Sequence, residues 1–399
     1  MKKNLLLLSV LLLGVSVVCA QSATSKIPHT HSTRKVAVSK RTEIIVPQVN
    51  GYNCYKGDFH IHTTYSDGRV NPAGRVIEAW EDGLDIIAIT DHYESRSGEK
   101  RFLKVIAPYS SDGKPMEYQN AKTAGAIKAD FNAIHQEAVD QLNKSGYPML
   151  LIKGCEMARN AKTHGHFNAL FLKNINTVYN ADMKVAFEKV REQGGIVIHN
   201  HPAWRRKTSD KTEFHESVYG ANLISGVEVA NGYSFYPHIV RRCIDEKLAM
   251  FGNTDVHGFT SGYAANGDLR TMTLVFAKNL TEKAVKEAIL KRRTLVYSGG
   301  DLIGEESWLK GLLNASIDCR MVKEDAKKGV RTYQLTNHSS FSYHFRRGKT
   351  TYELQPFKTV LFTFGKNKKT GEYLPPRVRV ENMWIADYKH PTIELELDK

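Results

Sequence analysis

The sequence feature that most constrains the fold is a series of short apolar stretches, each next to histidine, aspartate or glutamate. Between residues 55 and 300, these stretches alternate with segments of helical pattern. Such alternation predicts repeated strand–helix units and a largely parallel sheet. About seven or eight strands over roughly 250 residues favour a barrel over an open sheet. The chain therefore belongs to the α/β class.

The spacing of the apolar residues and the length of each stretch distinguish the expected strands from the expected helices. The expected strands lie at 56–61, 84–90, 149–155, 166–172, 196–199, 226–229, 249–253 and 294–297. The expected helices lie at 72–82, 118–144, 183–193, 237–246 and 282–291. After Gly299-Gly300 the pattern changes to period-two alternation of apolar and polar residues. We therefore expect the barrel over 49–300 and a small C-terminal antiparallel β-sandwich domain over 301–399.

The N-terminus has the composition of a targeting segment. Lys2 and Lys3 precede a continuous apolar run at 5–18, and a small residue follows. This arrangement predicts a secretory signal peptide over 1–20. The protein is then exported, with a bacterial periplasm as the simplest compartment. Residues 21–48 are rich in Ser, Thr and Lys and predict a flexible lead-in.

The five cysteines do not suggest a disulfide framework. Cys19 lies inside the predicted signal peptide and offers an alternative to simple secretion, a lipid anchor on its sulfur. The other four are scattered, which excludes a cysteine-rich zinc site, and we expect them to be mostly free, buried thiols. They are Cys54, Cys155, Cys243 and Cys319.

The chain is strongly basic. Its formal net charge is +14, and removal of Lys2 and Lys3 with the signal peptide leaves +12 (14 − 2). This charge favours anionic partners, among them phosphate esters and nucleic acid, although a generally basic surface is the alternative. The sequence has no dense arginine tract or zinc-finger spacing, so we expect no stable nucleic-acid partner. No segment of the mature chain is long and apolar enough to be a transmembrane helix.

The first candidate site is the motif at 57–68. His60 and His62 stand two residues apart at the end of a predicted strand, where side chains two apart share a face. Asp67 follows on a Ser-Asp-Gly turn and adds a hard oxygen ligand. The three residues are predicted metal ligands.

Two further apolar strands end in polar residues. The strand at 84–90 is followed by Asp91 and His92, and the strand at 149–155 is followed by Glu156. In a parallel barrel such positions open onto one mouth. His92 is then directed at the same mouth as His60, and we expect it to bind metal. We also expect Glu156 to bind metal, because a buried carboxylate is costly unless it is paired or metal-bound. Asp91 is a candidate for proton transfer, for orienting a histidine, or for a structural turn.

Histidines also flank the next strands. His164 and His166 open the strand at 166–172, and we prefer His166 as the ligand because the strand continues directly from it. The strand at 196–199 leads to His201, a predicted ligand, while His199 is a candidate for supporting a ligand, for contacting substrate or for catalysis. Finally, Asp255 and His257 repeat the two-apart spacing. The predicted ligand set is His60, His62, Asp67, His92, Glu156, His166, His201, Asp255 and His257.

These motifs, in this order, resemble those of the PHP (polymerase and histidinol phosphatase) superfamily over residues 55 to 300. The resemblance implies a distorted (β/α)7 TIM-like barrel with two or three divalent ions. It implies that His60, His62, Glu156 and Asp255 hold the first ion. Glu156 would bridge to a second, completed by His166 and His201, and Asp67, His92 and His257 would hold a third. With its predicted export and its C-terminal β domain, the chain most resembles the periplasmic phosphodiesterase branch of this superfamily. Members of that branch act on phosphodiesters, including organophosphate diesters.

Charge supports phosphoester chemistry independently. Three divalent ions, three carboxylates and one bridging hydroxide sum to about +2, which attracts an anionic phosphate. Mixed nitrogen and oxygen ligands favour Mn²⁺ or Zn²⁺, with Fe²⁺ also suitable, over Ca²⁺ or Mg²⁺. We expect an in-line attack on phosphorus by a metal-bridging hydroxide, with His199 or Asp91 protonating the leaving group.

Substrate contacts are expected from loops near the mouth. Arg159, Arg205 and the neighbouring Arg206 carry guanidinium groups that can grip phosphate oxygens. Trp204 and Tyr233 can stack on an aromatic ester group. The alternatives to a phosphodiesterase are a phosphomonoesterase, a nuclease acting on DNA or RNA ends, and a binding module that has lost catalysis.

Overall fold

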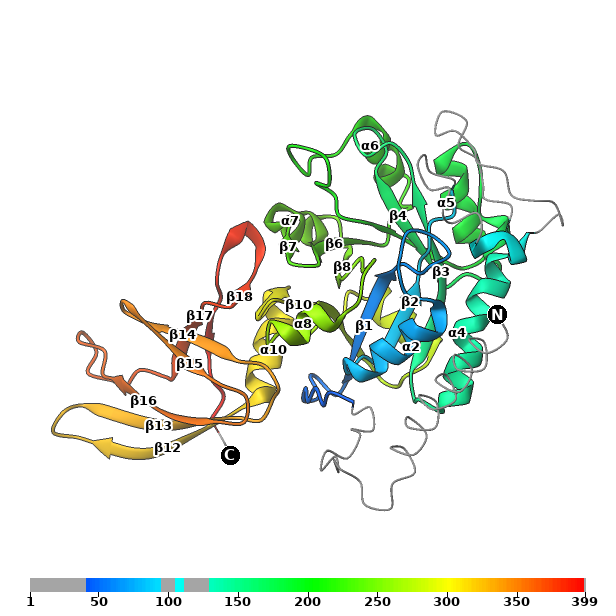
Figure 1. Ribbon diagram of the computed structural model, residues 1–399. Helices are drawn as coiled ribbons and strands as arrows, with labels where there is room; N and C mark the ends of the chain where they lie inside the picture. The colour runs from blue at the N-terminus through cyan, green and yellow to red at the C-terminus, as the bar shows by residue number, and fades with distance from the viewer. Residues whose placement is uncertain (1–40, 95–104, 111–128, 398–399) are drawn as a thin grey trace, which may run out of the picture. The chain divides into compact units, whose positions relative to one another are not determined.

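The computed structural model describes residues 41–94, 105–110 and 129–397 (Figure 1). The predicted signal peptide, most of the predicted lead-in and residues 118–128 of one predicted helix lie outside these residues. Within the described residues, no helix has the length and apolar character needed to cross a membrane.

A large mixed sheet forms the main body. Its strands are β1 (Asn53–Ile61), β2 (Ile86–Ile89), β3 (Leu150–Ala158), β4 (His166–Leu170), β5 (Ile196–His199), β6 (Gly226–Asn231), β7 (Ser234–Phe235), β8 (Ala249–Asn253), β9 (Met272–Ala277), β10 (Thr294–Ser298), β11 (Asp301–Gly304) and β18 (Met383–Trp384). They follow the order β18-β11-β10-β9-β1-β2-β3-β4-β5-β6-β7, with β8 paired to β6.

The sheet is parallel only in part. β1, β2 and β3 run parallel, as do β5, β6 and β8. The expectation of a largely parallel sheet fails at β4, which is antiparallel to both β3 and β5. Antiparallel neighbours need only a short connection, and residues 159–165 between β3 and β4 contain no helix. β9 is likewise antiparallel to β1 and β10.

The segment after β8 returns to the first strand. Ile61 and Val256 form a parallel bridge, and the His62 backbone N–H donates to the Val256 carbonyl at 3.1 Å. The mixed α/β class is confirmed, while the seven-unit (β/α) barrel stays a prediction.

Helices follow most strands. They are α2 (Pro72–Glu81), α4 (Phe131–Ser145), α5 (Met183–Glu192), α6 (Glu213–Gly220), α7 (Pro237–Asp245), α8 (Ser261–Ala265), α9 (Glu282–Leu290) and α10 (Glu306–Ser316), with short 3-10 turns at η1 (Ala107–Tyr109), η3 (Ile175–Thr177) and η4 (Ala386–Tyr388). α2 begins as expected, because Asn71 caps the Gly74 N–H at 2.7 Å and Pro72 occupies the first turn. α6, α8 and α10 were not predicted.

Two small antiparallel sheets complete the fold. One has the order β12-β13-β16 and the other β15-β14-β17-β19. Their bounds are β12 (Ile317–Asp325), β13 (Val330–Asn337), β14 (Tyr343–Arg347), β15 (Thr350–Leu354), β16 (Thr359–Gly365), β17 (Arg377–Val380) and β19 (Thr392–Glu394). The rings of Phe345 of β14 and Phe362 of β16 pack together between the two sheets, with their centroids 5.8 Å apart. The antiparallel character expected of this region is confirmed.

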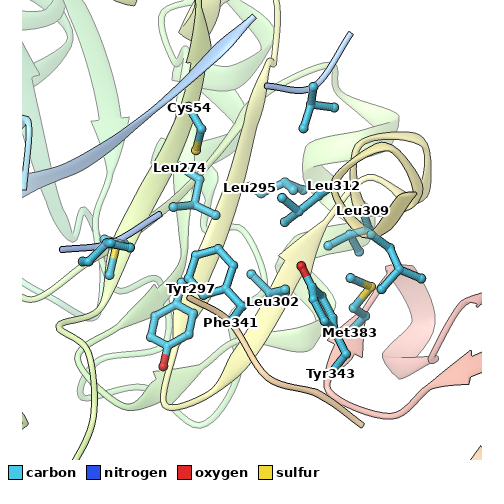
Figure 2. Close-up of a cluster of buried hydrophobic side chains, with 14 of the residues drawn as sticks. Cys54, Leu274, Leu295, Tyr297, Leu302, Leu309, Leu312, Phe341, Tyr343 and Met383 are labelled. Carbon is cyan, nitrogen blue, oxygen red and sulfur yellow. The ribbon is translucent and has the colours of Figure 1, made fainter. Parts of the chain in front are cut away.

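Buried apolar side chains connect these parts. Leu295 and Leu302 of the main sheet cluster with Leu312 of α10 and with Tyr343 of the small sheets (Figure 2). β11 pairs with β10, so the main sheet extends past residue 300, and the division of the chain at that residue stays a prediction. Cys54, Cys155 and Cys243 are buried free thiols, as expected, and Cys319 is buried too.

Candidate metal centre

The nine predicted ligands lie together at one end of the main sheet. Among the residues that the structure describes, four groups of nitrogen and oxygen atoms could each hold a metal ion, and these groups comprise those nine residues. Most follow strands of the parallel segments, but His166 is the first residue of β4. Because β4 is antiparallel to its neighbours, its beginning meets the ends of β3 and β5. The strand reversal therefore explains why this predicted ligand opens a strand.

Two of the four groups share His60 and together form the first group: one comprises His60, His62 and Glu156, and the other His60, His201 and Asp255. The His60 Nε2 atom lies 3.2 Å from His62 Nε2, 3.2 Å from Asp255 Oδ1 and 3.4 Å from Glu156 Oε1. His62 Nε2 lies 3.1 Å from the same Asp255 oxygen. Three different segments of the chain thus aim ligand atoms at a common point.

The second group consists of Glu156, His166 and His201. Glu156 Oε1 lies 3.3 Å from His166 Nδ1 and 3.6 Å from His201 Nε2. His164, the competitor of His166, instead bonds Thr163 at 2.9 Å and packs on Phe214. The preference for His166 therefore agrees with the geometry.

The third group is built around Asp67. Its carboxylate oxygens lie 3.4 Å from His62 Nδ1, 3.3 Å from His92 Nε2 and 3.2 Å from His257 Nε2. His92 also lies 2.7 Å from Glu156 through its Nδ1 atom. His62 belongs to this group as well as to the first, which the sequence did not suggest.

The spacing of the donor atoms fits divalent ions. Ligands about 2.1 Å from a tetrahedral or octahedral ion are separated from each other by roughly 3.0–3.4 Å. The contacts around Asp255 and Asp67, at 3.1–3.4 Å, fall in or next to this range. His60 and His62 also face each other through two ring nitrogens, an arrangement that a shared cation stabilises.

The buried charges depend on one another. Burial opposes ionisation of Glu156, but His92, His166 and His60 outweigh it and hold its pKa well below the usual value. Burial likewise opposes the charged form of His60, yet Asp255, Glu228 and Glu156 raise its pKa well above the usual value. The centre thus keeps its carboxylates ionised, as metal binding requires.

Two of the predicted ligands have an unusual backbone conformation. His201 has a φ of 24° and Asp255 a φ of 53°, a region that residues other than glycine rarely adopt. Such strain persists where the surrounding structure enforces it, and it clusters at functional sites.

Comparison with solved structures agrees with this geometry. No protein-family model and no curated protein matches the chain. Among solved structures, it is similar to a two-domain protein from Bacteroides vulgatus that contains a predicted PHP-like metal-dependent phosphoesterase. The two share 30% identity with a TM-score of 0.75, over 90% of this chain and 99% of the other. This chain belongs to the PHP superfamily.

More distant structures also match. A putative metal-dependent phosphoesterase from Bifidobacterium adolescentis has 15% identity and a TM-score of 0.37, over 59% of this chain and 96% of the other. The lesion-specific endonuclease Q from Pyrococcus furiosus has 12% identity and a TM-score of 0.36, over 67% of this chain and 62% of the other.

Asp91 of this PHP protein holds a turn. It accepts hydrogen bonds from the Thr63 backbone N–H at 2.7 Å, from the Thr63 hydroxyl at 2.6 Å and from the Ser66 hydroxyl. Ser66 in turn lies 3.2 Å from His62 Nδ1. Of the three roles suggested by the sequence, these contacts favour the orientation of His62 and of its turn.

His199 is turned toward the helices. Its ring stacks on Phe167 and packs at a tilt against His215, and its Nδ1 atom bonds the Tyr219 hydroxyl at 2.8 Å. It belongs to none of the four candidate groups. Burial, followed by the positive charge of neighbours including His215, holds its pKa well below the usual value. These contacts disfavour direct proton transfer by His199.

The predicted substrate-binding residues divide into two kinds. Trp204 packs on His166 and His201, with ring centroids at 4.8 and 5.4 Å, and the Arg205 guanidinium stacks on Trp204 at 4.3 Å. Both therefore flank the metal centre. Arg159 instead forms an ion pair with buried Glu94, which leaves its charge compensated.

The structure adds residues that the sequence analysis missed. Asn200 bonds Glu156 at 2.9 Å and fixes its carboxylate, while Glu228 bonds His60 at 2.8 Å. Buried Arg75 donates to the carbonyls of His62, Val256 and Gly258 and so secures two ligand-bearing loops. Glu228 had a sequence signal, because it is a lone carboxylate between Val227 and Val229 in an apolar strand.

Proposed function

We propose that this chain is an exported phosphodiesterase that depends on two or three divalent ions, Mn²⁺ or Zn²⁺ first and Fe²⁺ as an alternative. The observation that supports this proposal most directly is the convergence of buried histidines around Glu156. Its carboxylate lies within 3.6 Å of ring nitrogens of five histidines. Bound divalent ions would activate water and stabilise negative charge on phosphate oxygens.

The ligands divide among three ions in this proposal. His60, His62, Glu156 and Asp255 hold the first. Glu156 also serves the second, together with His166 and His201. Asp67, His92 and His257 hold the third, to which His62 is also close.

Charge favours a diester over a monoester. Three divalent ions bring +6, and the carboxylates of Asp67, Glu156, Asp255 and Glu228 bring −4, which leaves +2 (6 − 4) for nucleophile and substrate. A hydroxide and a singly charged diester match this surplus, whereas a monoester with nearly two charges exceeds it. Because Glu228 lies 2.8 Å from His60 and is buried, its charge belongs in this sum.

The substrate side is formed by Trp204 and Arg205. The indole beside His166 and His201 offers an aromatic face for an ester group, and Arg205 offers a cation beside it. Asp91 acts as a positioning residue in this proposal, and the leaving group departs without direct help from His199. Esters with a good leaving group, such as a phenolate, are therefore the preferred substrates.

A diester and monoester comparison tests the proposal. Protein loaded with Mn²⁺ or Zn²⁺ is given bis(4-nitrophenyl) phosphate and 4-nitrophenyl phosphate under the same conditions, with Glu156→Gln as the matched inactive control. We expect a higher kcat/KM for the diester and loss of activity in the control. Faster turnover of the monoester would count against the diesterase, and release of nucleotides from a labelled oligonucleotide would favour a nuclease.

A further inference from the structure

Next to the nine candidate ligands lies a buried carboxylate that belongs to none of their four groups. Glu228, in β6, is completely buried, yet the possible ligand groups do not include it. We propose that Glu228 is a positioning residue that couples two ion sites, because it holds one ligand of each site without contacting the ion itself. This inference rests on the proposed metal-dependent function.

Each carboxylate oxygen of Glu228 accepts two hydrogen bonds. Oε1 accepts from His60 Nδ1 at 2.8 Å and from Asn253 Nδ2 at 2.9 Å. Oε2 accepts from the His201 backbone N–H at 2.7 Å and from Asn231 Nδ2 at 2.9 Å. One side chain therefore joins β1, the loop after β5, and the ends of β6 and β8.

The first consequence concerns the tautomer of His60. A carboxylate is an acceptor only, so its contact with Nδ1 requires that this nitrogen carry the proton. The lone pair of a neutral ring is then on Nε2, which is the atom that faces Asp255 and His62. Glu228 thus orients His60 as a ligand of the first ion and increases its basicity.

The second consequence concerns the backbone of His201. Its φ of 24° is strained for a residue with a side chain, and the hydrogen bond to Glu228 helps to hold this conformation. The conformation directs the His201 ring toward Glu156, at 3.6 Å. Glu228 therefore also fixes a ligand of the second ion.

The site requires a carboxylate rather than an amide. The Asn253 amide is held as a donor toward Glu228, because its Oδ1 accepts the Phe59 N–H at 2.9 Å. A glutamine at 228 has one oxygen and one NH2 group in place of two carboxylate oxygens. In either orientation of this amide, the NH2 group would face two of the four donors and could not accept their hydrogen bonds. The orientation toward His60 would favour the opposite tautomer, in which Nε2 carries the proton and cannot bind metal.

Zinc titration tests this role without any ester substrate. Zn²⁺ is titrated into metal-free wild type, Glu228→Gln and Asn231→Ala, with calorimetry for affinity and elemental analysis for stoichiometry. We expect Glu228→Gln to weaken binding at the first and second sites about 10- to 100-fold, the usual effect of losing a carboxylate that orients a histidine ligand. Asn231→Ala removes one donor but leaves both ligand contacts, so its affinities should stay close to those of wild type.

Wild-type affinity at both sites in Glu228→Gln would overturn the proposal, as would an equal loss in both variants. A second measurement needs no variant at residue 228. In the ¹⁵N-histidine spectrum of the zinc-loaded wild type, His60, assigned by its absence in His60→Gln, should carry its proton on Nδ1. A proton on Nε2 would contradict the proposal. Wild type that binds Zn²⁺ but hydrolyses no ester would count only against the proposed function.

Discussion

Asn200 Nδ2 donates a hydrogen bond to Glu156 Oε1 at 2.9 Å, and the same amide bonds Asn168 at 2.8 Å. Glu156 is the carboxylate shared by the first and second candidate groups, so its orientation affects both. Asn200 therefore sets the position of the predicted bridging ligand without joining a candidate group.

Replacement of Asn200 should weaken metal binding. We expect Asn200→Ala to lower the affinity for Zn²⁺ about tenfold, because groups that orient ligands commonly have effects of this size. Activity at limiting metal should fall in parallel and recover with excess metal. Competition with a chromogenic chelator measures the affinity, and Asn266→Ala, at an exposed position, is the control. Unchanged affinity would show that Glu156 needs no support from Asn200.

Loss of Glu156 and loss of Asp67 should differ in the number of ions removed. Glu156 contributes to two candidate groups, whereas Asp67 contributes to one. We expect Glu156→Gln to lose about two ions per chain and Asp67→Asn about one, relative to wild type. Elemental analysis after gel filtration gives the counts. Equal losses in the two variants would contradict the assignment of Glu156 as the bridge.

The sequence could predict that the nine candidate ligands lie together, because strand ends are local features. His60 and His62 are spaced two apart, as are Asp255 and His257, and each pair lies at the end of an apolar strand, where this spacing predicts neighbouring side chains. The start of α2 was similarly local, since Asn71 and Pro72 define it. The pairing direction of β4 was less accessible, because it depends on which strands become neighbours.

Two predicted site residues, Arg159 and His199, have contacts that the sequence did not suggest. Arg159 has a loop position that suggested substrate binding, but its partner Glu94 is 65 residues away in sequence. His199 shares the strand-end pattern of the ligands, yet its ring packs against Phe167 and His215. Long-range contacts of this kind decide where a polar side chain points, and one sequence does not reveal them.

The Arg159 ion pair makes a prediction about stability. Glu94 is buried and also accepts the Ala158 N–H at 2.6 Å, so removal of Arg159 leaves a buried charge without its counter-ion. We expect Arg159→Ala to lower the free energy of unfolding by about 3 kcal/mol. Urea denaturation of metal-loaded protein measures this change.

A second variant separates this role from substrate binding. In Arg159→Ala with Glu94→Gln, the buried charge is gone, so much of the lost stability should return, and KM for a diester should match that of wild type. A KM that rises in both variants while stability stays unchanged would restore Arg159 to the substrate site.

Acid should destabilise the protein through His135, a buried residue of α4 outside the metal centre. Burial, with a smaller contribution from Lys153, lowers the pKa of His135 to about 4. An unfolded histidine has a pKa of about 6.5, so between these values the unfolded chain binds more protons than the folded one. The free energy of unfolding should therefore fall as the pH drops from about 6.5 to 4, by up to about 1.4 kcal/mol per pH unit.

Comparison of variants isolates this effect from the other histidines. Urea denaturation is measured at several values of pH for wild type, His135→Leu and the exposed control His238→Leu. The stability of His135→Leu should depend less steeply on pH, because the neutral leucine removes one site of proton uptake on unfolding. The control should keep the wild-type slope. The same slope in all three proteins would show that His135 is protonated as readily in the folded chain as in the unfolded one.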